Sequence, residues 1–138
     1  MICDTSALLA ALWSDQPESE QCTRILKDAP LAVLSPFVLA EFDFLVANAT
    51  STQKASKAVR HLTESGFELA EFGWSDVRSA LEVCETYSDL GLGLTDASLV
   101  VLAKRYKTNE ILTLDQTRFR AIRGLDGRHL QLLPFDTD

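Results

Sequence analysis

The chain has 138 residues, of which 46% are hydrophobic and 24% charged, and its formal net charge is −7. This composition is typical of a single globular domain that buries a sizeable core. Charged residues interrupt every apolar run well short of a membrane span, and the first residues form an apolar segment without a basic leader. We therefore expect a cytoplasmic protein without a membrane segment, and the net charge by itself argues against a nucleic-acid partner.

Hydrophobic periodicity and turn residues predict strands that alternate with helices along the whole chain. Strands are expected at residues 1–3, 31–34, 68–72, 110–114 and 130–135. Helices are expected at residues 6–13, 18–28, 37–48, 51–64, 75–87, 96–103 and 117–122. Ser35, Ser75 and Thr95 are the expected N-caps of three of these helices. The alternation predicts a three-layer α/β/α domain around a central, mainly parallel sheet of about five strands.

Four acidic residues stand at comparable places in this pattern. Asp4 and Asp115 each follow a strand, Asp96 lies in the first turn of an apolar helix, and Glu41 borders the apolar stripe of helix 37–48. A carboxylate at a helix start is also stabilised by the helix dipole, so each acid alone fits a purely structural role. Ligands of parallel sheets bind beyond the carboxyl ends of the strands, so all four acids can converge at one edge.

Converging carboxylates require a counter-charge. Two like charges 4 Å apart repel by about 4 kcal/mol at an effective dielectric constant near 20. Oxygen ligands without neighbouring cysteine or histidine favour a hard cation, Mg²⁺ or Mn²⁺. Such a site suits the hydrolysis of a phosphodiester, and the metal would make an acidic protein compatible with a nucleic-acid substrate.

Several other polar residues have two readings. Ser6 either donates to Asp4 or caps the first helix, and Thr113 either holds water or phosphate at the site or is an ordinary strand residue. Arg118 and Arg120, in the basic C-terminal third, could reach phosphates or be solvated. The histidines lack a neighbouring nucleophile, the three cysteines match neither a zinc nor a disulfide pattern, and no P-loop, G-x-G-x-x-G or G-x-S-x-G motif is present.

Four segments together resemble the PIN-domain ribonucleases, and in particular the VapC toxins of VapBC toxin–antitoxin pairs. They are Ile2-Cys3-Asp4-Thr5-Ser6-Ala7-Leu8-Leu9, Ser35-Pro36-x-x-x-Ala40-Glu41, Leu92-Gly93-Leu94-Thr95-Asp96-Ala97-Ser98 and Leu112-Thr113-Leu114-Asp115. Each segment is weak evidence alone, but the four occur in the family's order over nearly the whole chain. One departure follows Asp115, where many members carry a basic pair and this chain has Gln116-Thr117.

The resemblance implies a single PIN-like nuclease domain over residues 1–138 that acts as an endoribonuclease dependent on Mg²⁺ or Mn²⁺. Its catalytic and metal-binding quartet would be Asp4, Glu41, Asp96 and Asp115, with Ser6 and Thr113 as supporting residues. The implied partners are an RNA substrate, of the tRNA or ribosomal RNA class, a second copy of the chain, and a cognate antitoxin that occludes the site. Operator DNA would be contacted only through the antitoxin.

Two other functions compete with a nuclease. A non-catalytic PIN-like module that binds RNA or protein would keep the fold but tolerate asparagine at all four acidic positions. A receiver-like phospho-switch also uses strand-end acids and Mg²⁺ on a parallel sheet. The chain lacks the receiver's adjacent acidic pair after the first strand and its acceptor aspartate at a mid-chain strand end.

Overall fold

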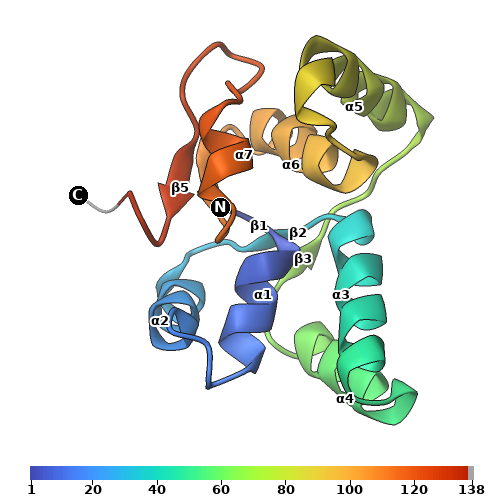
Figure 1. The fold of residues 1–138 in the computed structure, drawn as a ribbon, viewed down its shortest axis with the longest axis vertical. Coiled ribbons are helices and arrows are strands. Elements are labelled where there is room, and N and C mark those ends of the chain that lie inside the picture. Colours follow the sequence, from blue (N-terminus) through green and yellow to red (C-terminus); the bar gives the residue numbers. More distant parts are fainter. Residues whose placement is uncertain (137–138) are drawn as a thin grey trace.

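A computed structural model describes residues 1–136 of the chain (Figure 1). The strands are β1 (Ile2–Cys3), β2 (Val33–Leu34), β3 (Glu68–Leu69), β4 (Glu110–Leu112) and β5 (Gln131–Leu133). The helices are α1 (Thr5–Leu12), α2 (Ser19–Asp28), α3 (Pro36–Ala49), α4 (Thr52–Thr63), α5 (Trp74–Thr86), α6 (Leu94–Arg105) and α7 (Gln116–Arg120). A short 3₁₀ helix spans Ser88–Leu90.

The five strands form one sheet in the order β3-β2-β1-β4-β5, and every neighbouring pair is parallel. Helices α1–α4 cover one face and α5–α7 the other, as Figure 1 shows below and above the sheet. This division follows from right-handed crossovers, because the chain first builds outward from β1 to β3 and then returns to the other side of β1. The predicted three-layer fold around a parallel sheet of five strands is therefore confirmed.

The change of direction places the loops after β1 and β4 on opposite faces of the sheet. Strand β1 leads into α1, whereas its neighbour β4 leads into α7. In open parallel sheets, the crevice between two such loops is where ligands bind. Asp4 immediately follows β1 and Asp115 lies three residues beyond the end of β4, so both stand at this crevice.

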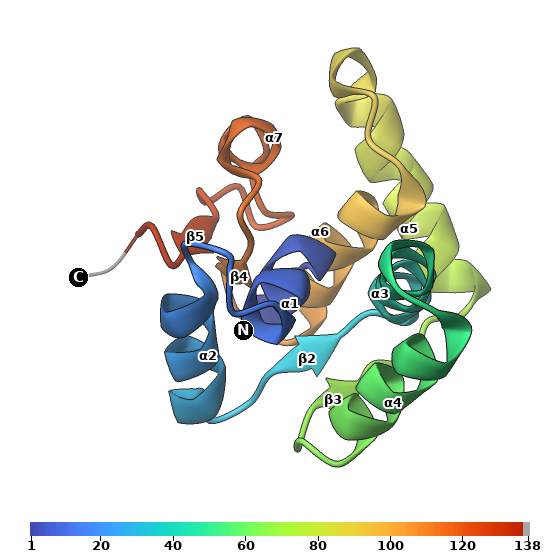
Figure 2. The same ribbon diagram turned by 60° about the horizontal axis from the view of Figure 1, so that its bottom comes forward.

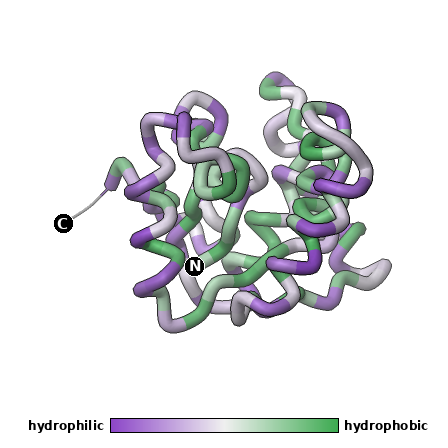
Figure 3. Tube along the Cα trace, turned by 90° about the horizontal axis from the view of Figure 1, so that it is seen from below, coloured by the Kyte–Doolittle hydropathy of each residue, from purple (hydrophilic) through white to green (hydrophobic). Residues whose placement is uncertain are grey.

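The core is built from the strands and from α6. Ile2, Val33, Ile111 and Leu132 are fully buried and lie in register on four neighbouring strands. In α6 seven consecutive residues, 97–103, are buried, because this helix packs against β1, β4, α5 and α3. Figure 3 shows hydrophobic segments gathered inside the molecule and hydrophilic ones along its outer loops. No helix within residues 1–136 combines the length and the apolar character needed to cross a membrane.

Two of the predicted N-caps are wrong. Helix α6 begins one residue before Thr95, and its N-cap is Gly93 in an extended conformation. Helix α5 likewise begins before Ser75, at N-cap Gly73, whose backbone N–H donates to the Asp76 carboxylate at 2.9 Å. Ser35 does cap α3, because its hydroxyl accepts from Phe37 N at 3.1 Å and Pro36 occupies the first helical position.

Candidate functional site

Asp4 is the buried centre of the candidate site. It is the N-cap of α1, and the residue is only 6% exposed. One carboxylate oxygen accepts from Thr5 N at 2.8 Å, and the other accepts from the hydroxyls of Thr113 at 2.7 Å and Ser6 at 3.0 Å. Burial raises the pKa of Asp4, and the three donors oppose that rise by stabilising the ionised form.

Thr113 and Ser6 tie the loop after β4 to the carboxylate of Asp4. The Thr113 hydroxyl, fully buried, also accepts from Asp115 N at 3.0 Å. The Ser6 hydroxyl accepts from Leu114 N at 3.0 Å. Each hydroxyl thus donates to Asp4 and accepts from a backbone N–H of the loop after β4, which fixes the carboxylate and both loops in one arrangement. Of the two readings of Ser6, the structure shows the hydrogen bond to Asp4.

Asp96 faces this cluster from the first turn of α6. Its carboxylate forms an ion pair with Arg118, whose Nη1 lies 2.6 Å from Asp96 Oδ2. The Asp96 side chain is 15% exposed. Burial raises the pKa of Asp96, Arg118 lowers it, and the charges of Asp115 and Glu41 raise it further. Asp96 therefore lies within electrostatic reach of Asp115 and Glu41, and its charge also raises the pKa of Asp4.

Asp115 closes the cluster as the N-cap of α7. Its Oδ1 accepts from Arg118 N at 3.0 Å, and its Oδ2 lies 3.7 Å from Arg118 Nε. Asp96, Asp115 and Asp4, in that order of effect, raise the pKa of the Arg118 guanidinium. A continuous network of contacts thus runs from Asp4 through Thr113 and Asp115 to Arg118 and Asp96.

Glu41 lies at the margin of this network. Its charge acts on Asp96, but the residue is exposed on α3, and within residues 1–136 its carboxylate forms no hydrogen bond or ion pair. Glu41 borders the apolar stripe of α3 as expected from the sequence, but its side chain is exposed, so the core does not desolvate its carboxylate.

The sequence matches the PIN domain family over residues 1–125. The chain belongs to the PIN-domain family. This PIN domain is 37% identical to Ribonuclease VapC26 of Mycobacterium tuberculosis (strain ATCC 25618 / H37Rv) over 135 residues, which are 97% of this chain and 100% of that protein. The predicted membership is thereby confirmed.

Solved structures agree with the fold of this PIN domain. The crystal structure of Mycobacterium tuberculosis VapC20, described as a sarcin-ricin loop cleaving toxin, superposes with a TM-score of 0.77 at 16% identity, covering 87% of this chain and 93% of that one. VapBC2 from Rickettsia felis, bound to a DNA fragment from its promoter, gives a TM-score of 0.68 at 17% identity, covering 90% and 93%.

The PIN domain brings Asp4, Asp96 and Asp115 into one bonded network and leaves Glu41 beside it. Sequence reasoning missed the role of Arg118, which pairs with Asp96 instead of standing free for phosphate. Its position three residues after a strand-end aspartate at the start of a short helix was the available signal. Arg120, the other candidate for phosphate, is held by Asp136 through contacts of 2.6 and 2.7 Å.

The donor atoms suit a hard divalent cation. The cluster offers carboxylate oxygens, with no sulfur or imidazole ligand, which is the set that Mg²⁺ and Mn²⁺ prefer. As they stand, no three acidic, histidine or cysteine side chains within residues 1–136 lie close enough together to hold a metal ion. The guanidinium of Arg118 supplies positive charge between Asp96 and Asp115 instead.

Proposed function

We propose that this PIN domain is a metal-dependent endoribonuclease and the toxin of a toxin–antitoxin pair, with residues 1–138 acting as a single nuclease domain. The observation that carries the proposal is the bonded network of Asp4, Asp96 and Asp115 at the crevice where the strand order reverses. The relationship to Ribonuclease VapC26 supports it, since that protein is 37% identical over its full length.

The carboxylates of Asp4, Asp96 and Asp115 would hold the cation, Mg²⁺ or Mn²⁺, with Glu41 as the fourth acid. When bound, the cation supplies positive charge that neutralises the phosphodiester and acidifies a water molecule. Exposed Glu41 can change rotamer without breaking any contact described above.

Two hydroxyl residues of the network, Thr113 and Ser6, orient the acids. Thr113 and Ser6 hold Asp4 in one rotamer, so that its carboxylate is already oriented before a ligand enters the crevice. Thr113 also holds Asp115 N, which fixes the start of α7 relative to β1. Because both hydroxyls are committed to protein partners, we assign them positioning roles and not contact with RNA.

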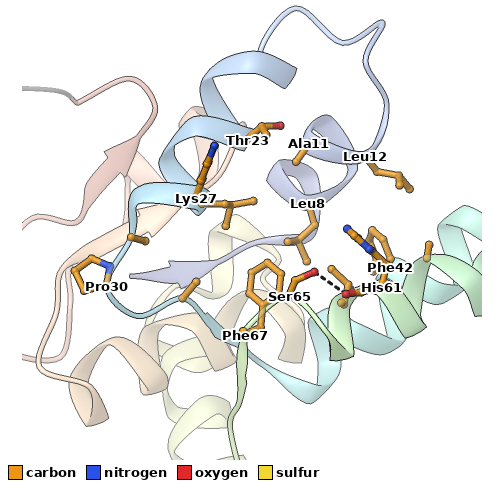
Figure 4. Close-up of a pocket in the computed structure, with 16 residues that line it drawn as sticks. Leu8, Ala11, Leu12, Thr23, Lys27, Pro30, Phe42, His61, Ser65 and Phe67 are labelled. Atoms are coloured by element: carbon orange, nitrogen blue, oxygen red, sulfur yellow. Dashed lines mark hydrogen bonds between the residues drawn. The ribbon is translucent and has the colours of Figure 1, made fainter.

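A hydrophobic groove offers a surface for the antitoxin. It has a volume of about 740 Å³ and is lined by residues of α1, α2, α3 and α4 (Figure 4). Figure 2 labels the ribbons of these four helices. Apolar side chains dominate its lining and include Leu8, Leu12, Leu26, Phe42, Leu62 and Phe67. We propose that an apolar segment of the cognate antitoxin occupies it, as a helix or strand would in a hydrophobic groove. Solved toxin–antitoxin complexes from Klebsiella pneumoniae and Haemophilus influenzae share the fold.

The groove and the acidic network lie at different edges of the sheet. The groove is lined by Pro30 and Ala32, which precede β2, and by Phe67, which precedes β3. The acids follow the carboxyl ends of β1 and β4. An antitoxin segment in the groove must therefore continue along α1 to cover Asp4. Pairing of two toxin chains, and contact with operator DNA through the antitoxin alone, belong to the same proposal.

Calorimetric titration of the metal-stripped protein with Mn²⁺ tests the site before any RNA is known. Wild type should bind Mn²⁺, and Asp96→Asn should lose binding while it remains folded. Equal or absent binding in both proteins would contradict the metal site and favour a non-catalytic module that binds RNA or protein. Cleavage of tRNA and ribosomal RNA with and without Mn²⁺, mapped at the 5′ ends of the products, then tests the activity, with Asp4→Asn as the inactive control.

A matched pair of variants tests the groove. Leu12, 40% exposed, lines it, whereas Leu81, 45% exposed, lies on α5 at the opposite face of the sheet. Leu12→Glu should abolish binding of the co-expressed antitoxin, because it places a charge in an apolar site. Leu81→Glu should leave antitoxin binding intact. Equal antitoxin binding by both variants would refute the assignment.

A further inference from the structure

Arg118 places its guanidinium between two of the proposed metal ligands. Its Nη1 lies 2.6 Å from Asp96 Oδ2 and its Nε lies 3.7 Å from Asp115 Oδ2. We propose that Arg118 is a built-in counter-cation, which holds these carboxylates together without metal and competes with a divalent cation for them. The inference rests on the proposed function, because it assumes that the carboxylates bind metal.

The fold fixes Arg118 in this place. Its backbone N–H donates to Asp115 Oδ1 at 3.0 Å, which closes the first turn of α7. The next residue, Phe119, is 1% exposed and anchors the helix in the core. The side chain of Arg118 therefore starts one helical turn from Asp115 and spans the crevice to α6. This contact joins residues 22 positions apart and is not a pairing between helix neighbours.

The other arginine pairs of the C-terminal half lie away from the acids. Arg120 binds Asp136, Arg105 binds Asp76 at 2.7 Å, and Arg128 binds Asp126 at 2.7 Å. Among residues 1–136, Arg118 is the basic side chain that forms ion pairs with the acidic network. The three carboxylates of the network outnumber this one guanidinium, and Glu41 beside it adds a fourth, so an excess of negative charge remains that attracts a divalent cation.

Arg118 and a divalent cation would share the Asp96 carboxylate. With Nη1 2.6 Å from Asp96 Oδ2, the guanidinium takes up one lone pair of that oxygen, and its positive charge repels a metal ion at the same carboxylate. The Arg118 side chain is 42% exposed, and an ion pair open to solvent on one side is weak enough for a doubly charged ion to displace. Arg118 therefore lowers the apparent affinity for metal, and so sets the concentration at which the site fills.

Calorimetry with Mn²⁺ on metal-stripped protein measures this competition. Arg118→Gln should bind Mn²⁺ about tenfold more tightly than wild type, which corresponds to about 1.4 kcal/mol. Arg118→Lys should fall between the two, because it keeps the charge but not the planar group. Arg120→Gln, which removes a neighbouring arginine whose partner lies outside the network, should bind as wild type does.

Thermal unfolding gives a second measurement that does not depend on cleavage. In the presence of EDTA, Arg118→Gln should melt below wild type, because the carboxylates lose their counter-charge. Saturating Mn²⁺ should raise its Tm by more than it raises that of wild type. If Arg118→Gln does not fold without metal, Arg118→Lys provides the same comparison.

The outcomes separate this inference from the proposed function. Mn²⁺ binding by wild type, with equal or weaker binding by Arg118→Gln, would overturn the inference and leave the metal site standing. Absence of Mn²⁺ binding in wild type and in every Arg118 variant would overturn both. Binding by Arg118→Gln at concentrations where wild type stays empty would be the strongest support.

Discussion

Two threonines lie beside Asp4, and replacing each by valine should change the stability of the protein in opposite directions. Thr113 is fully buried, and its hydroxyl donates to Asp4 at 2.7 Å and accepts from Asp115 N at 3.0 Å. Thr5 is 2% exposed, and its hydroxyl has no hydrogen-bond partner in the described part of the chain. Replacement by valine keeps the shape of both side chains. Thr113→Val should therefore destabilise the protein, whereas Thr5→Val should not.

The contacts set the size of the difference. A hydrogen bond to a charged group contributes about 1.5–3 kcal/mol, and a buried N–H left without an acceptor costs about 1–3 kcal/mol. After allowance for the apolar gain of a buried methyl group, Thr113→Val should lose about 2–4 kcal/mol. Removal of an unpaired buried hydroxyl should stabilise Thr5→Val by about 1 kcal/mol. For a domain of this size the two melting temperatures should differ by roughly 10 °C or more.

Urea denaturation at pH 7 in EDTA, followed by circular dichroism, measures both free energies of unfolding. EDTA keeps metal binding from adding to the difference. Thr113→Val should also weaken Mn²⁺ binding, because Asp4 and Asp115 lose their shared anchor, while Thr5→Val should bind as wild type does. Free energies of unfolding within about 0.5 kcal/mol of each other would refute the role given to Thr113.

Three further predictions concern the charged and buried polar groups. Burial raises the pKa of Asp96 above 3.8, so ionisation of its carboxylate lowers the stability of the folded protein. Asp96→Asn should therefore raise the Tm of the metal-free protein at pH 7. The gain in Tm should vanish as the pH falls below about 4. Arg120 lowers the pKa of Asp136 to about 2, so the stabilisation that Arg120→Gln removes should be present at pH 6 and disappear as the pH falls from about 4 to 2, measured by thermal unfolding. The hydroxyls of Ser35 and Ser98 are fully buried and 2.8 Å apart, so Ser98→Ala should cost about 1–2 kcal/mol in urea denaturation, and an unchanged midpoint would contradict that bond.

The sequence by itself determined the architecture of this PIN domain. Alternating strands and helices and the Ser35-Pro36 start of α3 follow from local periodicity and backbone preference. The placement of Asp4 and Asp115 after strands also follows, and the carboxyl ends of parallel strands share one edge, but the adjacency of β1 and β4 is a result of the structure. The helix starts of α5 and α6 do not, since glycine in an extended conformation can end the preceding loop as well as a serine or threonine can.

Only the tertiary structure decided which side chains complete the site. The bond between Thr113 and Asp4 joins residues 109 positions apart, and the pair of Arg118 with Asp96 crosses from α7 to α6. The exposure of Glu41 depends on where α3 sits against its neighbours. Sequence periodicity assigns a residue to a face of its own element, but the partner that it meets depends on how elements pack and on side-chain rotamers. The acids could thus be predicted from the chain, whereas the pairing of Arg118 with Asp96 could not.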